Sequence, residues 1–187
     1  MTIFYYSFII LALLACLTVS FRIKKQQYLI LYLFVIVLLS LLAGLRYDNA
    51  DYENYLEIFK NPWEVSPDKG FSAFVLIVRW FTTSPIYMFL PVAIIAVSLN
   101  ISSYRKYSPY LFVSVLFYFV HSFLLKEYVQ IRAGLSCAIC LYAIRYIEYK
   151  SLWKYIACMV IAMSIHMSSI IFFPMFWVYY FMKNKSN

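Results

Sequence analysis

The chain has 187 residues, of which 65% are hydrophobic and 13% charged, and its formal net charge is +8. Its mean hydropathy of +0.78 is too high for a soluble domain of this length, so we predict an all-α integral membrane protein, a polytopic helix bundle. In a soluble protein, this charge would suggest a nucleic-acid partner. Here the basic residues lie between apolar runs, which is typical of positive-inside topology, and no nucleic acid is expected.

Seven apolar runs are candidate membrane spans; most are close to the ~20 residues that a spanning helix needs, and the last two are a little short. They are residues 3–21, 28–45, 86–103, 109–125, 127–147, 149–165 and 167–182. We therefore expect about seven spans in a single integral membrane domain, residues 1–187, with a polar outer loop over residues 46–69. No basic residue precedes the first run, whereas Arg22, Lys24 and Lys25 follow it. This order predicts an N-terminus outside and no cleavable signal peptide.

The outer loop contains one amphipathic segment. Its apolar side chains recur at helical spacing and share one face: Tyr52, Tyr55, Leu56 and Phe59. Charged residues occupy the remaining positions. This pattern predicts a short helix lying on the membrane surface.

Residues 70–83 decide the topology of everything that follows them. The segment is apolar but short, contains Arg79 and Trp80, and is followed by Ser84 and Pro85. Apolar runs of this length are often re-entrant or interfacial, and we predict that placement. The charged residues of the inner loops are then all basic except Glu148, which gives a strong positive-inside bias.

Four charged or titratable residues lie in or beside apolar runs and fall on the outer side of this topology: Arg46, Lys126, Arg132 and His166. Charge near lipid is costly and usually marks a functional site, so we predict an outer site for an anionic substrate. Arg132 lies about a turn and a half into the fifth run, and Lys126 and Gln130 share one helical face. The arginine fork suits phosphate oxygens. The alternatives are that Arg132 snorkels or pairs with Glu127, and that Lys126 is a surface anchor.

His166 and two further side chains, Asp51 and Tyr52, could carry chemistry. His166 follows the sixth run and has a reference pKa suited to acid–base work near neutrality, although a lone histidine is more often structural. Asp51 and Tyr52 lie in the outer loop, where carboxylates and tyrosines often bind sugar hydroxyls. Asp51 is equally well explained as the N-cap of the surface helix.

No metal or cofactor is expected. Cys137 and Cys140 have the C-x-x-C spacing, but no second Cys or His pair accompanies them. No glycine-rich phosphate loop occurs. Gly134-Leu135-Ser136 with His166 hints at an intramembrane serine protease, but Cys137 stands where that pattern needs glycine.

Five short motifs occur in order along the chain. They are Gly44-Leu45-Arg46-Tyr47; Asp51-Tyr52 with Tyr55; Lys69-Gly70-Phe71; Arg132-Ala133-Gly134-Leu135; and Ala162 through His166-Met167-Ser168-Ser169. Together they resemble the EpsG family, the Wzy-like polymerases of bacterial exopolysaccharide and capsule. Asn49-Ala50 stands where the family tends to have Gly-Thr. Members usually run much longer, so the chain is expected to be the N-terminal part of such a protein.

The resemblance implies a glycosyltransferase that polymerises undecaprenyl-diphosphate-linked oligosaccharide repeat units at the outer face of the cytoplasmic membrane. Its partners would be that lipid-linked substrate, the lipid bilayer, and a flippase and chain-length regulator of the same pathway. The roles that follow are diphosphate binding by Arg46, Arg132 and Lys126, base catalysis by His166 or Asp51, and sugar orientation by Tyr52. The alternatives are a transporter or flippase component for lipid-linked glycans and a non-catalytic truncated fragment.

Overall fold

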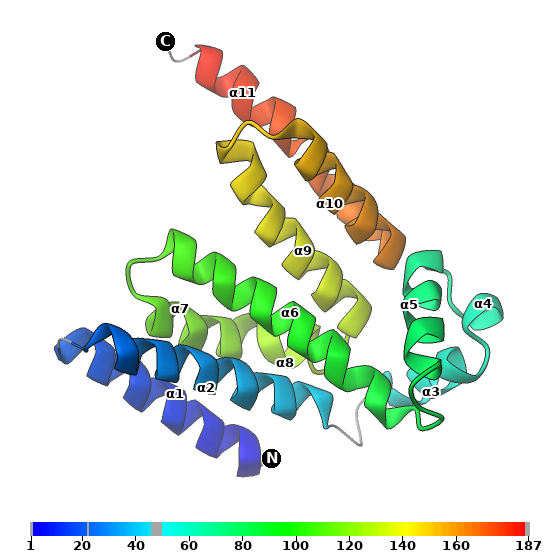
Figure 1. Ribbon diagram of the computed structural model, residues 1–187, viewed down its shortest axis with the longest axis horizontal. Coiled ribbons are helices and arrows are strands. Elements are labelled where there is room, and N and C mark those ends of the chain that lie inside the picture. The colour runs from blue at the N-terminus through cyan, green and yellow to red at the C-terminus, as the bar shows by residue number, and fades with distance from the viewer. Residues whose placement is uncertain (1, 22, 46–49, 186–187) are drawn as a thin grey trace.

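The structure, a computed structural model, describes residues 2–21, 23–45 and 50–185, with side chains up to residue 183. Over these residues every regular element is a helix and none is a strand (Figure 1), which confirms the all-α prediction. The elements are α1 (Thr2–Ser20), α2 (Lys25–Gly44), α3 (Tyr52–Lys60), α4 (Pro62–Val65), α5 (Lys69–Arg79), α6 (Ile86–Tyr107), α7 (Leu111–Tyr118), the π-helix η1 (Phe119–Phe123), α8 (Leu124–Lys126), α9 (Ile131–Glu148), α10 (Leu152–Ile165), the 3₁₀ helix η2 (Met167–Phe172) and α11 (Met175–Lys185).

Three helices of the described part are long and apolar enough to cross a membrane: α1, α2 and α6. At a rise of about 1.5 Å per residue, each reaches roughly the 30 Å of a bilayer core. The apolar helices of residues 111–126 and 152–165 are shorter. Membrane character follows from these helices, whereas the number of about seven spans and the outer N-terminus stay predictions.

The predicted span over residues 127–147 begins too early. Helix α8 ends at Lys126, a turn covers residues 127–129, and α9 begins only at Ile131. The buried Glu127 carboxylate explains the turn, because it accepts hydrogen bonds from Asn100 Nδ2 and Tyr118 Oη, both at 2.9 Å. The prediction that Lys126 and Gln130 share one helical face is therefore wrong.

The predicted span over residues 167–182 is not one regular helix. It consists of η2 and α11, separated by Phe173 and Pro174. Proline has no backbone N–H with which to continue a helix, which accounts for the break before Met175.

The amphipathic helix of the outer loop is confirmed as α3, but its apolar face is covered by protein. Ile58 is fully buried and Tyr55 is 2% exposed, and both pack in a cluster with Phe71 of α5 and Phe89 of α6. Helix α5 itself has 11 residues, about 16 Å, and is too short to cross a bilayer. The re-entrant or interfacial placement of residues 70–83 stays a prediction.

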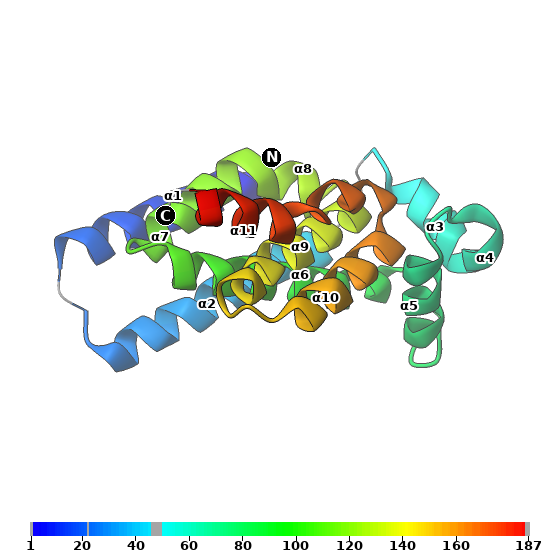
Figure 2. The ribbon, with the colours of Figure 1, turned by 90° about the horizontal axis from the view of Figure 1, so that it is seen from above.

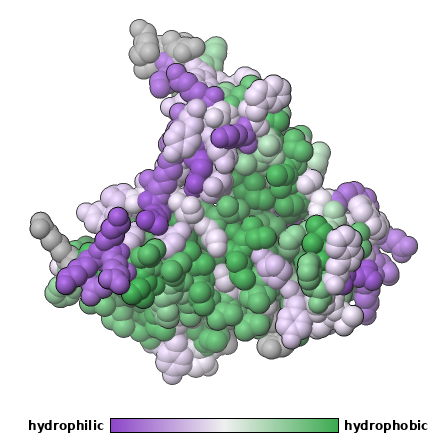
Figure 3. All heavy atoms as spheres, viewed as in Figure 1, coloured by the Kyte–Doolittle hydropathy of each residue, from purple (hydrophilic) through white to green (hydrophobic). Residues whose placement is uncertain are grey.

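The loops separate into two groups at opposite ends of the molecule. Figures 1 and 2 place α3, α4 and α5 at one end and the α1–α2 connection at the other. At the C-terminal ends of α6 and α9, Lys106 pairs with Glu148, and Arg145 Nη2 donates to Ser102 Oγ at 3.3 Å. Figure 3, drawn in the same view as Figure 1, shows a band of apolar residues between groups of hydrophilic residues. The ends of α6 and α9, which are both predicted to lie inside, are therefore in contact.

Candidate functional site

A polar cluster forms where three distant segments meet at the α3–α5 end of the molecule. Asp68 directly precedes α5, Arg132 lies in the first turn of α9, and His166 follows α10. Arg132 Nη1 donates to Asp68 Oδ2 at 2.8 Å, and His166 Nδ1 lies 3.5 Å from the same oxygen. The N–H of Met167 donates to Asp68 Oδ1 at 3.4 Å. One carboxylate thus joins α5, α9 and the α10–η2 turn.

The charged groups of this cluster are largely buried, so their contacts matter for the stability of the fold. Asp68 is only 9% exposed and the Arg132 side chain 16%. Removing a carboxylate from water is expensive unless charge and hydrogen-bond donors replace the water, and the guanidinium and the Met167 amide do so here. Asp68 occupies the N-cap position of α5, yet its side chain makes no capping hydrogen bond. The Asp68 carboxylate therefore binds Arg132 and the Met167 amide instead of capping α5.

Two glycines allow the segments to come this close. A Cβ atom on Gly70 would lie 2.7 Å from the carbonyl carbon of Ser164, so only glycine lets the first turn of α5 touch the end of α10. A Cβ atom on Gly134 would lie 2.5 Å from the carbonyl oxygen of Lys126. The α8–α9 turn therefore folds back onto α9, which fixes the helix start that carries Arg132.

A small polar pocket of about 190 Å³ adjoins the cluster. Its lining residues come from α3, from α9, from the residues just before these two helices, and from the α10–η2 turn: Asp51, Tyr55, Gln130, Arg132, Ala133 and His166. Pockets for whole drug-sized ligands span roughly 300–1,000 Å³, so this one suits a single polar group of a larger molecule. It lies at the N-terminus of α9, where the helix dipole favours negative charge.

Arg132 brings positive charge to the pocket, and it shares that charge with Asp68. The Nε atom of Arg132 is buried and has no hydrogen-bond partner among the described residues. The Arg132 guanidinium also lies over the ring of Tyr55, with its Cζ atom 6.0 Å from the ring centre. Burial raises the pKa of Tyr55, so its hydroxyl stays protonated near neutral pH and remains a hydrogen-bond donor.

His166 lies at the edge of this site, partly open to solvent. Its side chain is 32% exposed, and its Nε2 atom lies 3.0 Å from Ser168 Oγ. The chain turns at His166, because α10 ends at Ile165 and η2 begins at Met167. The ring therefore touches Asp68 on one side and a partly solvated hydroxyl on the other.

The structure brings some predicted site residues together and separates others. Arg132, His166 and Asp51 line one pocket. Lys126 does not line it, and Tyr52 stacks on Phe89 with ring centres 5.6 Å apart. Arg46 lies outside the described residues. Arg132 is the second residue of α9 rather than a turn and a half into a helix, and it forms an ion pair with Asp68, whereas the alternative predicted from the sequence was a pair with Glu127.

Sequence reasoning missed Asp68, Tyr55 and Gln130 as site residues. Asp68 directly precedes the Lys69-Gly70-Phe71 motif, which was the signal available for it. Tyr55 was assigned to an apolar face and to a family motif, with no role in binding. Its hydroxyl group was the signal that it could also serve a polar pocket.

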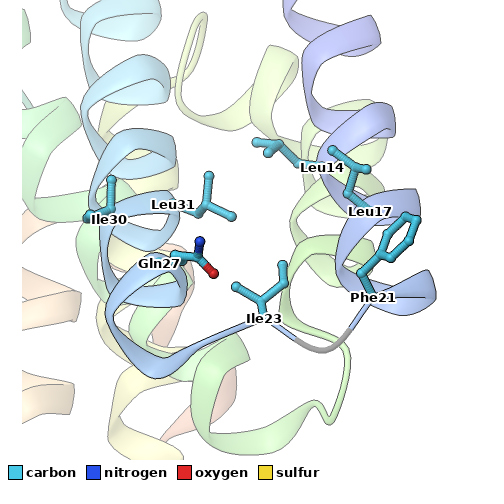
Figure 4. Close-up of a pocket in the computed structure, with 7 residues that line it drawn as sticks. All are labelled: Leu14, Leu17, Phe21, Ile23, Gln27, Ile30 and Leu31. Carbon is cyan, nitrogen blue, oxygen red and sulfur yellow. The ribbon is translucent and has the colours of Figure 1, made fainter.

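Two other kinds of candidate site, a metal site and a second pocket, are relevant in the described part of the chain. No group of three or more His, Cys, Asp or Glu side chains there is placed to hold a metal ion, and the four cysteines are free. A larger pocket of about 460 Å³ lies between α1 and α2, lined by apolar side chains and Gln27 (Figure 4). It contains no charged or nucleophilic group.

Comparison with known proteins gives the family. Residues 29–187 match the model of the EpsG family, which is most of the chain. The chain belongs to the EpsG family. It is also similar to the amylovoran biosynthesis protein AmsC of Erwinia amylovora, with 31% identity over 131 residues, which covers 61% of this chain and 35% of AmsC. The chain thus spans about a third of the length of this curated relative. No solved structure matches it.

Proposed function

We propose that this EpsG-family chain acts in bacterial polysaccharide synthesis as a membrane glycosyltransferase. It would join undecaprenyl-diphosphate-linked oligosaccharide repeat units at the outer face of the cytoplasmic membrane, in which it is a multi-pass protein. The observation that carries the proposal is that Arg132 and His166 line one small pocket and that the Asp68 carboxylate contacts both side chains. The name of AmsC, an amylovoran biosynthesis protein, supports the pathway.

The chemistry of such a transfer matches the groups in the pocket. An acceptor hydroxyl attacks the anomeric carbon of the donor, a new glycosidic bond forms, and the bond to the diphosphate breaks. Arg132 and the N-terminus of α9 stabilise the negative charge that develops on the leaving diphosphate. His166 accepts the proton of the attacking hydroxyl, and Asp51 is the second candidate for this base. Tyr55 donates a hydrogen bond to the bound group.

The remaining predicted roles complete the proposal. Arg46 and Lys126 stay candidates for phosphate contacts, and Tyr52 for sugar orientation. A flippase and a chain-length regulator of the same pathway would be the protein partners. The size of the pocket supports recognition of the diphosphate there, with the oligosaccharide and the polyprenyl chain outside it.

The test is the lipid-linked glycan of a strain that lacks this gene, with and without the chain restored. Repeat units that accumulate singly at the outer face and are converted to a ladder on restoration would support polymerisation. Repeat units trapped inside would indicate a flippase function instead. A glycan profile that does not change on deletion would contradict the proposal.

A further inference from the structure

Asp68 makes contacts that constrain the protonation of His166. An ionised carboxylate can only accept hydrogen bonds, so each group that binds it must present a hydrogen. Arg132 Nη1 and His166 Nδ1 share Oδ2, while the Met167 amide uses Oδ1. His166 satisfies this arrangement when its Nδ1 atom carries the proton. In the neutral ring, Nε2 then bears the lone pair.

The other side of the ring agrees with this assignment. Ser168 Oγ lies 3.0 Å from Nε2, where its hydroxyl can donate to that lone pair. An acceptor hydroxyl approaching His166 would make the same kind of hydrogen bond and give up its proton to the same atom. Ser168 is exposed, so substrate can displace its hydroxyl from this position.

We propose that Asp68 is a positioning residue that holds His166 as the Nδ1–H tautomer, so that Nε2 is the basic atom, while the same carboxylate orients Arg132. The role rests on the proposed function, in which Arg132 serves the donor and His166 the acceptor. A carboxylate that binds both side chains sets the distance between the leaving diphosphate and the base. Holding catalytic groups in a fixed relative geometry is a main source of rate enhancement.

The surroundings of Asp68 hold the carboxylate in place. Gly70 locks the first turn of α5 against Ser164 of α10, and Ser72 Oγ of α5 donates to the carbonyl of Pro62 at 2.6 Å. Ser66 Oγ accepts the N–H of Asp68 at 3.3 Å. The 3.5 Å between His166 and Asp68 is long for a hydrogen bond, whose usual range is about 2.7–3.2 Å. Catalytic contacts commonly shorten when substrate binds.

The first experiment does not depend on activity. The full chain, labelled with ¹⁵N-histidine, is placed in nanodiscs of phosphatidylethanolamine and phosphatidylglycerol at pH 8. The chain has two histidines, and replacing the exposed His121 by Gln leaves His166 alone. We expect a protonated Nδ1 and an unprotonated Nε2, and loss of this preference in Asp68→Ala. A protonated Nε2 in the parent protein, or no difference in Asp68→Ala, would overturn the inference.

The second experiment measures polymerisation with purified lipid-linked repeat units. Asp68→Asn keeps the shape of the side chain and removes its charge, and we expect kcat to fall at least about 100-fold, with KM for the donor changed less than about tenfold. The loss of a correctly held tautomer in a serine protease costs about 10⁴ in kcat, which sets the scale. The matched control is Glu57→Gln, an exposed carboxylate of α3, which should leave both kinetic constants unchanged.

The outcomes separate the two proposals. Active parent protein with unchanged kcat in Asp68→Asn would overturn the role of Asp68 and leave the polymerase proposal standing. Parent protein that joins no repeat units would contradict the proposed function, while the tautomer measurement would still decide the contact between Asp68 and His166. Asp68→Asn keeps the shape of the native side chain and Asp68→Ala does not. Circular dichroism of both variants shows whether either has lost its helical structure.

Discussion

Gly70 lies directly against Ser164, so closely that a Cβ atom at position 70 would be 2.5 Å from the Ser164 Cβ atom and 2.7 Å from its carbonyl carbon. Van der Waals contact between carbon atoms needs roughly 3.5–4.0 Å. The contact joins the beginning of α5 to the end of α10. Gly70 is two residues after Asp68 in the chain, and Ser164 is two residues before His166. The geometry of the polar site therefore depends on one missing methyl group.

Replacing Gly70 by Ala should separate Asp68 from His166. The added methyl group meets backbone as well as side-chain atoms of Ser164, so α5 must shift or α10 must bend. We expect polymer synthesis to fall at least about tenfold, because displacements near 1 Å can cost about 10²-fold in catalysis. Introducing Ser164→Gly into Gly70→Ala should restore part of the activity, since it removes the side-chain clash and leaves the backbone clash. Full activity in Gly70→Ala alone would contradict this account.

Arg132 should be required for its guanidinium and not only for its charge. In the proposed mechanism, Arg132→Ala removes a donor to the anion that develops on the leaving group, and losses of about 10²–10³ in kcat are typical of such a change. Arg132→Lys keeps one positive charge but cannot make the planar two-point contact, so we expect it to recover only a small part of the activity. The readout is glycan chain length, with the amount of protein in the membrane measured in parallel.

The matched control for these variants is Arg105→Lys. Arg105 lies in the last turn of α6, and its guanidinium is over the ring of Tyr32, 5.0 Å from the ring centre. This variant should retain the parent chain length. Normal chain length in Arg132→Ala would rule Arg132 out of the site.

Local sequence rules were enough for the helical class and for several site residues. Apolar length identified α1, α2 and α6 within a few residues, and helical spacing identified α3. These features depend on burial and periodicity, which the sequence displays directly. Arg132 and His166 stood out because charge beside lipid is costly.

The remaining features depend on contacts between segments far apart in the chain. Asp68 resembles an ordinary N-cap residue in sequence, and only the close approach of α5 to α10 turns it toward Arg132 and His166. The late start of α9 depends on Glu127 binding Asn100 of α6, 27 residues away. Tyr55 was assigned to an apolar face, although one edge of its side chain reaches the pocket. No local pattern encodes such pairings.

The buried Glu127 cluster should stabilise the fold more than it serves catalysis. Tyr118→Phe removes the hydroxyl that donates to the Glu127 carboxylate, and Asn100→Leu removes the amide donor. A buried charged group that loses a hydrogen bond typically costs about 1–3 kcal/mol, so each variant should lower the free energy of unfolding by that amount. Thermal unfolding in detergent measures the effect. Stability equal to the parent in both variants would show that these hydrogen bonds contribute little.

The re-entrant or interfacial placement of residues 70–83 can be tested by labelling single cysteines from one side of the membrane. The four native cysteines are first replaced by Ala, and cysteine is then introduced at Asn61, Ser84 or Ser108. If the chain returns to the outer face after α5, an impermeant maleimide added to intact cells labels Asn61→Cys and Ser84→Cys, which flank α5. Ser108→Cys, which follows α6, reacts only after permeabilisation, because the basic end of α6 is predicted to lie inside. Labelling of Ser108→Cys in intact cells together with protection of Ser84→Cys would mean that the α5 segment crosses. Arg132 and His166 would then lie on the inner side, and a polymerase site at the outer face would be excluded.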